Sequence, residues 1–370
     1  MSYHRIVAKF GTGLLTSGTD HLAMQIMSSL VKQIARLHQQ GKEIIIISSG
    51  AIASGRQKLR EVPERKNVPF KQVLASVGQS CLMYAYEQLF SKYDITVAQA
   101  LLTKGDLSDR NGYLNARNTL LALIELGIIC IVNENDVVAV DEIAELKFGD
   151  NDNLSAMVSN LVDADLLALL TNIGGLYTAD PHCNPQAQLI CRVDNIDEEI
   201  ERMAGDTVSC QGIGGMTTKI EAARLATCSG VNVVIANGLE PNILVRISRG
   251  EDTGTFFPAQ VNKMESKKRW MLSGLASKGK IMVDKGAVSA LKEHNKSLLP
   301  AGIIKAEGRF HRGDIVDILD ERSKRVGYGI SNYDSSDLAF IAGKHSDNIP
   351  SLLNYDYGDE AIHKNNMVML

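Results

Sequence analysis

The pattern of apolar runs is the feature that most constrains the fold of this chain. Between residue 6 and about residue 250, short runs typical of buried strands alternate with longer segments that repeat apolar residues at helical spacing. The strand-like runs occupy residues 6–10, 43–48, 95–102, 128–132, 166–171 and 231–236, and the main helical patterns occupy 21–40, 70–93 and 113–126. This alternation predicts a three-layer α/β fold, in which a mostly parallel sheet carries helices on both faces.

Polar or glycine-rich segments follow most of these strands. They are Gly11–Gly13, Ser49–Gly55, Asn133–Asp136 and Asn172–Tyr177. Because the carboxyl ends of parallel strands meet at one edge of a sheet, we expect these segments to gather where open α/β sheets bind ligands. Gly50 and Gly55 have P-loop spacing, but Arg56-Gln57 follows where that loop needs Lys-Ser/Thr, which excludes a Walker A loop.

The stretch Lys147–Ser155 (KFGDNDNLS) concentrates polar groups ahead of a helical pattern. A polar loop that opens a helix suits an anion or metal site, whereas an isolated stretch of this kind is more often an Asx-rich turn that caps the helix. The other polar segments of the same sheet edge favour the site. For Asp150, a metal ligand and a cap both remain open.

Two further segments suit bound phosphate. Gly212–Lys219 offers backbone N–H groups, a helix start and a lysine, and Thr218 with Glu221 has the spacing of a capping box. Lys9 stands at the end of a strand beside two glycines, where it either snorkels outward or points at phosphate. The sequence shows no nucleophile paired with a base, which suits a substrate that brings its own nucleophile, such as an ionised carboxylate.

The bulk composition excludes several classes of protein. With 370 residues the chain exceeds one ordinary core, so we expect two domains. Its net charge of −4 argues against a protein dominated by nucleic-acid or membrane electrostatics, and no apolar run approaches the roughly 20 residues of a membrane span. Six scattered cysteines without a CxxC pair indicate reduced thiols in a cytoplasmic protein and do not favour a structural zinc site.

The pattern changes after about residue 255. Residues 263–285 hold seven lysines and arginines against two acidic residues, which is typical of a solvated linker, and short strand-like runs with glycine turns follow. We therefore predict a first domain at 1–257, a linker at 258–274, a small mainly-β domain at 275–355 and a tail at 356–370.

Seven segments in order resemble those of the glutamate 5-kinase family, a branch of the amino acid kinases that carries a PUA barrel domain. They are Ala8–Thr12, Ser49–Ala53, Leu114–Arg117, Asn133–Asp136, Phe148–Asn153, Gly175–Pro181 and Gly214–Lys219. Val283–Ala287, Ser297–Pro300 and Arg312–Asp314 resemble the PUA segment, so the resemblance covers nearly the whole chain.

The resemblance implies that ATP, with Mg²⁺ bridging its phosphates, phosphorylates the side-chain carboxylate of L-glutamate in the first step of proline biosynthesis. Lys9 and Lys219 would neutralise the transferring phosphoryl group, Asp152 would orient them, and Lys147 would lie near the substrate. Glutamate would bind at Ser49, Gly50, Ala51, Asn133, Asp136 and Asn151. The nucleotide would contact Lys9, Thr171, Asn172, Ile213, Gly214, Gly215, Met216, Thr217, Thr218 and Lys219. Ligands for the metal are not assigned.

The family also implies feedback inhibition by proline, a homo-tetramer or dimer, a glutamyl phosphate reductase as partner, and RNA as a ligand to be tested for the PUA domain. Two positions depart from the family pattern: Gly13 replaces a usual serine and Asn172 a usual aspartate, so we expect altered nucleotide handling. Three alternatives stay open: a kinase for aspartate, acetylglutamate, carbamate or uridylate; an RNA-binding protein; and a weakly active sensor of proline or glutamate.

Overall fold

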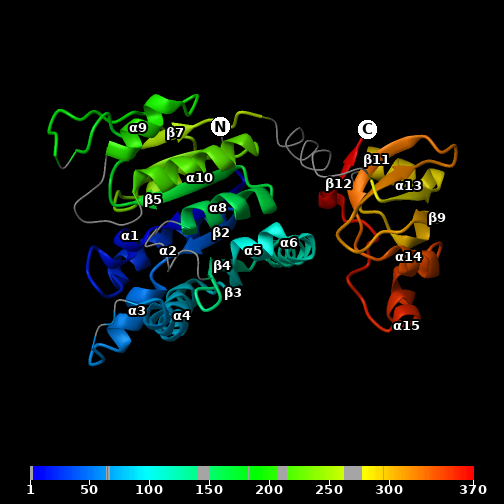
Figure 1. Cartoon of the computed structure of the whole chain (residues 1–370), viewed down its shortest axis with the longest axis horizontal. Helices are drawn as coiled ribbons and strands as arrows, with labels where there is room; N and C mark the ends of the chain where they lie inside the picture. Colours follow the sequence, from blue (N-terminus) through cyan, green and yellow to red (C-terminus); the bar gives the residue numbers. More distant parts are fainter. Residues whose placement is uncertain are drawn as a thin grey trace. The chain divides into compact units, whose positions relative to one another are not determined.

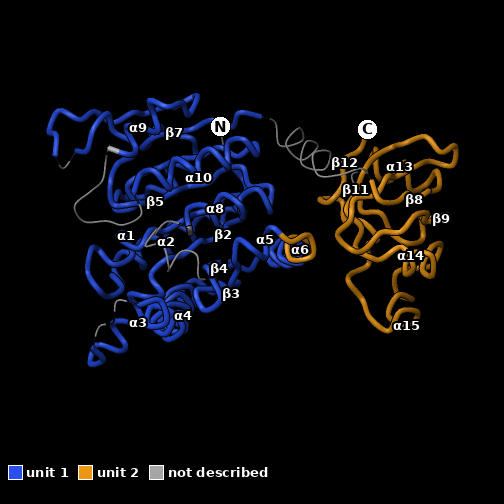
Figure 2. The backbone as a smooth tube through the Cα atoms, viewed as in Figure 1, with its two compact units in different colours: residues 1–108, 115–263 blue, residues 109–114, 264–370 orange. Residues whose placement is uncertain are grey.

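The computed structural model describes residues 3–63, 65, 67–139, 150–181, 183–206, 215–261, 277–294 and 296–370. The chain divides into two compact units, coloured separately in Figure 2. The first unit comprises residues 1–108 and 115–263, and the second comprises residues 109–114 and 264–370. No helix among the described residues is long and apolar enough to cross a membrane.

A seven-stranded sheet in the order β3-β4-β2-β1-β5-β6-β7 forms the centre of the first unit. Its strands are β1 (Arg5–Phe10), β2 (Glu43–Ser48), β3 (Val97–Leu102), β4 (Ile129–Glu134), β5 (Leu166–Thr171), β6 (Asn232–Asn237) and β7 (Thr255–Phe257). All pairings are parallel except β6 with β7. The mostly parallel sheet predicted from the sequence is thus confirmed, with an antiparallel edge strand added.

Helices cover both faces of this sheet. Alternate strand residues such as Ile6, Ala8 and Phe10 face a core shared with α2 (Met24–Gln39), α4 (Val68–Phe90) and α11 (Ile243–Ser248). On the other face α8 (Asp150–Leu161) contacts the strands β1, β2, β4 and β5, and it lies beside α10 (Met216–Cys228) (Figure 1). Further helices among the described residues are α1 (Thr12–Thr16), α3 (Ala51–Lys58), η1 (Ser91–Tyr93), α5 (Lys104–Ser108), α9 (Glu198–Asp206) and α6 (Arg110–Glu125), whose first residues, up to Leu114, are assigned to the second unit.

Two glycines allow α3 and α4 to cross at very short range. A Cβ atom at Gly55 would lie 1.9 Å from the carbonyl oxygen of Leu74, and one at Gly78 would lie 1.7 Å from that of Ala51. Only glycine fits at these two positions, because any side chain would collide with backbone atoms of the facing helix. The crossing holds the start of α3, which follows Ser49 and Gly50, firmly against α4.

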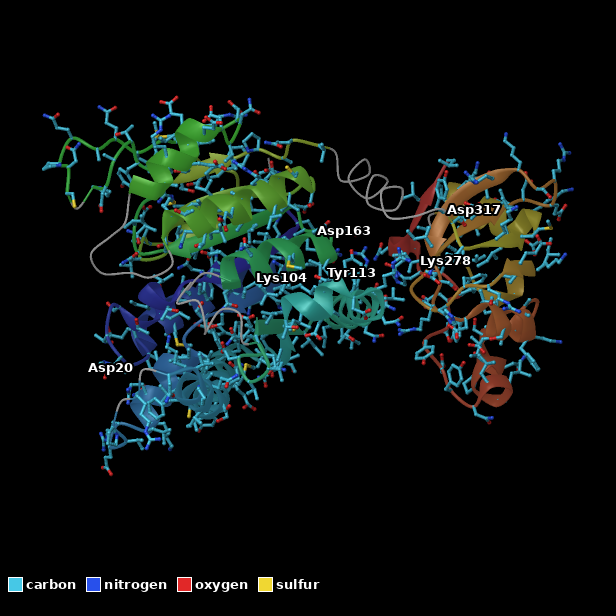
Figure 3. The ribbon with its side chains drawn as sticks, viewed as in Figure 1. Asp20, Lys104, Tyr113, Asp163, Lys278 and Asp317 are labelled. Atoms are coloured by element: carbon cyan, nitrogen blue, oxygen red, sulfur yellow. The ribbon has the colours of Figure 1, made fainter. Side chains whose placement is uncertain are left out.

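Helix α8 is anchored at its carboxyl end. Asp163, labelled in Figure 3, follows α8 and accepts a hydrogen bond from the Arg117 guanidinium at 2.5 Å. The buried Arg117 side chain also donates to the carbonyl oxygen of Leu161, the last residue of α8. A cation at the carboxyl end of a helix interacts favourably with the negative end of the helix dipole. Arg117, part of one of the family-like segments, therefore stabilises the helix whose opposite end carries Asn151 and Asp152.

The second unit is built on a five-stranded sheet in the order β12-β11-β10-β8-β9. Its strands are β8 (Gly279–Val283), β9 (Ile303–Gly308), β10 (Ile315–Leu319), β11 (Arg325–Ile330) and β12 (Met367–Met369). Its helices are α13 (Lys285–Glu293), η2 (Pro300–Gly302), α14 (Ser335–Ile341), η3 (Ser346–Asn348), α15 (Ile349–Leu353) and η4 (Lys364–Asn366). The mainly-β second domain predicted from the sequence is confirmed.

The segment 356–370 differs from the predicted tail. Its strand β12 pairs with β11, and Ala361 and Ile362 are fully buried in the core of the second unit. These apolar side chains complete that core, so the segment forms part of the folded unit.

Candidate active site

A buried carboxylate between two lysines forms the centre of the site. The Lys9 Nζ lies 2.6 Å from Asp152 Oδ1, and the Lys219 Nζ lies 3.3 Å from Asp152 Oδ2. Asp152 is 1% exposed, Lys9 5% and Lys219 7%. The three residues, which we call the lysine clamp, bring together groups that lie more than 60 positions apart in the sequence.

The fold explains why these residues meet. Lys9 is the fifth residue of β1, the central strand, and strand alternation turns it away from Ala8 and Phe10, towards the face covered by α8 and α10. Asp152 lies in the first turn of α8, and Lys219 lies in the first turn of α10. Since α8 and α10 are in contact, their first turns bring both side chains to the end of β1.

Burial and charge act in opposite directions on this cluster. Burial would raise the pKa of Asp152, but the charges of Lys9 and Lys219, with hydrogen bonds from Lys9 and Thr218, outweigh it and hold the pKa at about 2. Burial, aided by the charge of Lys219, lowers the pKa of Lys9 despite the opposing effect of Asp152. Two cations share one anion, so the clamp carries a surplus of positive charge that attracts an anion.

Thr218 does not form the expected capping box with Glu221. Helix α10 begins at Met216 with Gly215 as its N-cap, so Thr218 lies inside the first turn. Its hydroxyl lies within hydrogen-bonding distance of Asp152 Oδ2, at 2.8 Å, and of the Gly215 carbonyl oxygen, at 3.0 Å. The hydroxyl thus supports the carboxylate of the clamp, because the helix starts three residues earlier than the capping pattern suggests.

A chain of side-chain amides lies next to the clamp. The Asn151 Nδ2 donates to Asn133 Oδ1 at 3.1 Å and to Ser49 Oγ at 3.3 Å. Asn133 is 2% exposed and is the next-to-last residue of β4, where the polar segment that ends at Asp136 begins. Burial raises the pKa of the half-buried Asp136 to about 6. Ser49, Asn133 and Asn151 come from three separate segments and meet as the sequence predicted they would.

The segment after β2 needs an unusual backbone conformation. Gly50 is the N-cap of α3 and has a φ of +100°, a left-handed conformation that glycine adopts without strain. Ser49 precedes it and Ala51 opens the helix, and the backbone N–H of Ser49 donates to the Phe10 carbonyl oxygen at 3.2 Å. The turn therefore ties the end of β2 to the end of β1, beside Lys9.

Sequence reasoning missed two residues of α4 that support the amide chain and the end of β2. Gln79 Oε1 accepts a hydrogen bond from Asn133 Nδ2 at 2.8 Å, and Tyr86 shares a hydrogen bond of 2.8 Å with Ser48. They lie seven residues apart, on one helix face. Both residues lie inside a long helical pattern, in which nothing in the sequence distinguishes a polar residue of a site from one on the helix surface. The glycine before Gln79 was the available signal, because an interior glycine often indicates a close helix crossing.

The end of β5 places the two departures from the family pattern side by side. Thr171 donates to Asn172 Oδ1 at 3.2 Å, and a Cβ atom at Gly13 would lie 3.9 Å from Asn172 Nδ2. The Gly11 N–H also donates to the Leu170 carbonyl oxygen at 3.2 Å, which holds the two strand ends together. Strands β1 and β5 form the switch point of this sheet, where the chain order reverses. Open α/β sheets generally bind their ligands at such a point.

Some predicted residues fall outside the described ranges. Lys147, Ile213 and Gly214 are in this group, and of Asp150 only its place as the first residue of α8 is described. Gly215 is the N-cap of α10, and Met216 and Thr217 are its first two residues. Within the described residues, no three histidine, cysteine or acidic side chains gather as a metal site.

Comparisons with known proteins agree across the chain. The model of the amino acid kinase family matches residues 4–237, and that of the PUA domain matches residues 279–353. A glutamate 5-kinase of Dehalococcoides mccartyi is 59% identical over 370 residues, which cover 100% of this chain and 99% of that protein. Glutamate 5-kinases of Shewanella sediminis (49% identity; 100% and 99% covered) and Herpetosiphon aurantiacus (48%; 98% and 98%) are also similar.

Proposed function

The chain belongs to the amino acid kinase family, and from this membership we propose how its residues carry out the reaction of its relatives. It phosphorylates the side-chain carboxylate of L-glutamate with ATP, which gives L-glutamyl 5-phosphate and ADP and begins proline biosynthesis from glutamate. The observation that supports our assignment of roles is the buried lysine clamp, since phosphoryl transfer needs positioned positive charge more than any other group.

The clamp acts on the transferring group. Lys9 and Lys219 neutralise the negative charge that spreads over the γ-phosphoryl oxygens and onto the ADP leaving group. Asp152 keeps the two ammonium groups apart and orients them towards the phosphoryl group. The Thr218 hydroxyl, which donates a hydrogen bond to Asp152 Oδ2 at 2.8 Å, fixes the carboxylate in turn. Because these groups are already placed and largely shielded from water, little reorganisation is needed as charge develops.

The acceptor needs no general base. The side-chain carboxylate of glutamate has an ordinary pKa near 4.3, so it is ionised at neutral pH and attacks phosphorus directly. The enzyme must therefore overcome repulsion between this carboxylate and the phosphates. The surplus positive charge of Lys9 and Lys219 over Asp152 serves that purpose. Lys147 is proposed to add a third cation on the substrate side.

Glutamate is held beside the clamp. Ser49 and Asn151 face it together with Asn133, and the backbone of Gly50 and Ala51 offers polar groups at the start of α3. Asp136 accepts a hydrogen bond from the substrate ammonium. A cation beside Asp136 restores the ionised form that burial disfavours, since the pKa of this carboxyl is raised to about 6.

The nucleotide occupies the β1–β5 side of the sheet edge. Thr171 and Asn172 contact it from the end of β5, and Gly215, Met216 and Thr217 contact it from the start of α10. Ile213 and Gly214 precede that helix in the sequence and are proposed to contact the nucleotide as well. Mg²⁺ bound with ATP would neutralise negative charge on its phosphates, and because carboxylates are the usual protein ligands of this ion, Asp150 is the first residue to test as its ligand.

Trapping of the acyl phosphate tests this function. Purified protein is incubated with ATP, Mg²⁺ and hydroxylamine, and hydroxamate is measured with glutamate, aspartate or acetylglutamate as acceptor. ADP release is measured with carbamate and uridylate. We expect hydroxamate with glutamate alone. Equal product with aspartate or acetylglutamate, or ADP release only with carbamate or uridylate, would contradict the assignment of the acceptor.

Resemblance to the family supports wider proposals. We propose that proline inhibits the enzyme, that it forms a dimer or tetramer, that it acts with a glutamyl phosphate reductase, and that it is cytoplasmic. The hydroxamate assay with added proline, sedimentation analysis and co-purification test the first three. For the PUA domain, RNA binding is proposed from the matched domain alone, and a tRNA filter-binding measurement on the full chain tests it.

A further inference from the structure

We propose that Gln79 is a substrate-binding residue that selects an α-amino acid, through a hydrogen bond from its Nε2 to the α-carboxylate of glutamate. The inference rests on the proposed function and adds a residue and a ligand group to it. Gln79 lies in α4, is 9% exposed and is joined to the substrate residues by its bond to Asn133.

One backbone group fixes the orientation of the whole amide chain. The Glu134 backbone N–H donates to Asn133 Oδ1 at 2.9 Å, which identifies that atom as the oxygen. The Asn133 Nδ2 must then face an acceptor, so the atom of Gln79 that lies 2.8 Å away is Oε1. Asn151 presents its nitrogen to the same Asn133 oxygen. A backbone N–H can only donate, so it fixes which atom of the Asn133 amide is the oxygen. That assignment in turn fixes the oxygen and nitrogen atoms of the Gln79 and Asn151 amides.

This orientation leaves two complementary atoms in the described site without a hydrogen-bond partner. They are the Gln79 Nε2, a donor, and the Asn151 Oδ1, an acceptor, and both are buried. A buried polar atom that lacks a partner costs about 1–3 kcal/mol, so a ligand that satisfies it binds with a corresponding gain. An α-amino acid carries the matching pair, a carboxylate that accepts and an ammonium that donates.

Position decides which carboxylate of glutamate meets Gln79. Asn151 is next to Asp152 in α8, so the Asn151 end of the amide chain lies beside the lysine clamp. Gln79 is at the other end, two hydrogen bonds away through Asn133. The side-chain carboxylate must reach the clamp to be phosphorylated. The α-carboxylate is therefore the group left for Gln79.

The close crossing of α3 and α4 holds Gln79 in place. The preceding residue, Gly78, lies against the Ala51 carbonyl oxygen, where a Cβ atom would be 1.7 Å away. Two helical turns further along α4, the Tyr86 hydroxyl shares a hydrogen bond with the Ser48 hydroxyl. The helix is thus fixed on both sides of Gln79 to the segment that carries Ser49. A group held so rigidly discriminates between ligands with little loss of conformational entropy.

Gln79→Met and a ligand analogue test the contact together. Glutamate is compared with glutamate α-amide, which replaces the α-carboxylate by a neutral carboxamide. In Gln79→Met we expect the KM for glutamate to rise about tenfold or more and the KM for ATP to stay within about twofold. The preference in kcat/KM for glutamate over the α-amide should fall about fivefold or more, because the lost bond is stronger to a charged acceptor.

Two further variants separate binding from folding. Gln79→Glu keeps an acceptor for Asn133 but loses the donor, and it should show the same loss of preference if Gln79→Met does not fold. Gln33→Met is the matched control, since Gln33 is 5% exposed in α2 and both of its amide groups bond within the fold. We expect it to lower the unfolding temperature and to leave the KM for glutamate unchanged.

The outcomes are distinct from those of the proposed function. If the wild-type protein forms no hydroxamate from glutamate, the function itself is wrong. If the wild type is active, a folded Gln79 variant with an unchanged preference for glutamate over its α-amide overturns this inference alone. Equal losses for glutamate, the α-amide and ATP also overturn it, since they indicate a purely structural role.

Discussion

The ion pair between Lys9 and Asp152 offers a quantitative test of the clamp. The two side chains are 5% and 1% exposed, and their charged atoms lie 2.6 Å apart. Removal of one partner of such a pair leaves uncompensated charge in the interior, at a cost of about 3–5 kcal/mol. We expect Lys9→Met and Asp152→Asn each to lower the free energy of unfolding by about 3 kcal/mol or more.

Lys219, the third member of the clamp, determines which of the two substitutions lowers the free energy of unfolding more. In Lys9→Met the carboxylate still pairs with Lys219 at 3.3 Å, whereas in Asp152→Asn two buried lysines face each other without an anion. Asp152→Asn should therefore be the more damaging substitution. The double variant removes one charge of each sign, so its loss should be smaller than the sum of the single losses by about 1–3 kcal/mol.

Urea unfolding at neutral pH, followed by far-UV circular dichroism, measures all four proteins of this cycle. Asp20→Asn is the control, because Asp20 is an exposed carboxylate paired with the exposed His21 at 3.1 Å, and loss of such a surface pair should leave the free energy of unfolding nearly unchanged. Single losses that add to within about 0.5 kcal/mol refute the reasoning, because independent sites behave in that way.

Three further predictions follow from single sites. The pKa of Asp152 is about 2 when folded, below its ordinary 3.8, so it contributes about 2 kcal/mol of stability above pH 4 that is lost as the pH falls through 2; acid unfolding of wild type and Asp152→Asn should show this difference. Asn172→Asp should lower the KM for ATP about threefold, with or without Gly13→Ser, because the side chain gains a second acceptor oxygen; an unchanged KM and nucleotide preference refute this. Gly78→Ala should destabilise the protein by about 1–3 kcal/mol in thermal unfolding, whereas Gly205→Ala, which has open space around it, should not.

The layer structure was predictable from the sequence because buried strands and amphipathic helices have different apolar periods. The seven-stranded sheet contains a strand for each of the six predicted runs. The edge strand β7 was not predicted, since three residues in an antiparallel pairing leave almost no periodic signal. The short helices α1 and α11 were missed for the same reason: their lengths of 5 and 6 residues span less than two turns.

The site was only partly predictable. Lys9 and Asp152 carried local signals, namely a lysine at the end of an apolar strand and a polar loop before a helix. Their pairing with Lys219 depends on the contact between α8 and α10, which no local pattern encodes. Thr218 was assigned to a cap because its spacing to Glu221 fits one, yet the helix starts earlier and turns its hydroxyl to Asp152.

The turnover of Lys219→Ala tests most directly whether the clamp carries out phosphoryl transfer to glutamate. Lys219 is 7% exposed and 3.3 Å from Asp152, and loss of a donor to the transition state typically lowers kcat by about 100-fold to 1,000-fold. Lys92→Ala, which changes an exposed lysine in η1, is the control. We predict that Lys219→Ala, although less stable, still folds to the native structure and loses hydroxamate formation by that factor, while Lys92→Ala keeps it. A folded Lys219→Ala protein with near-normal turnover would contradict the proposed role of the clamp.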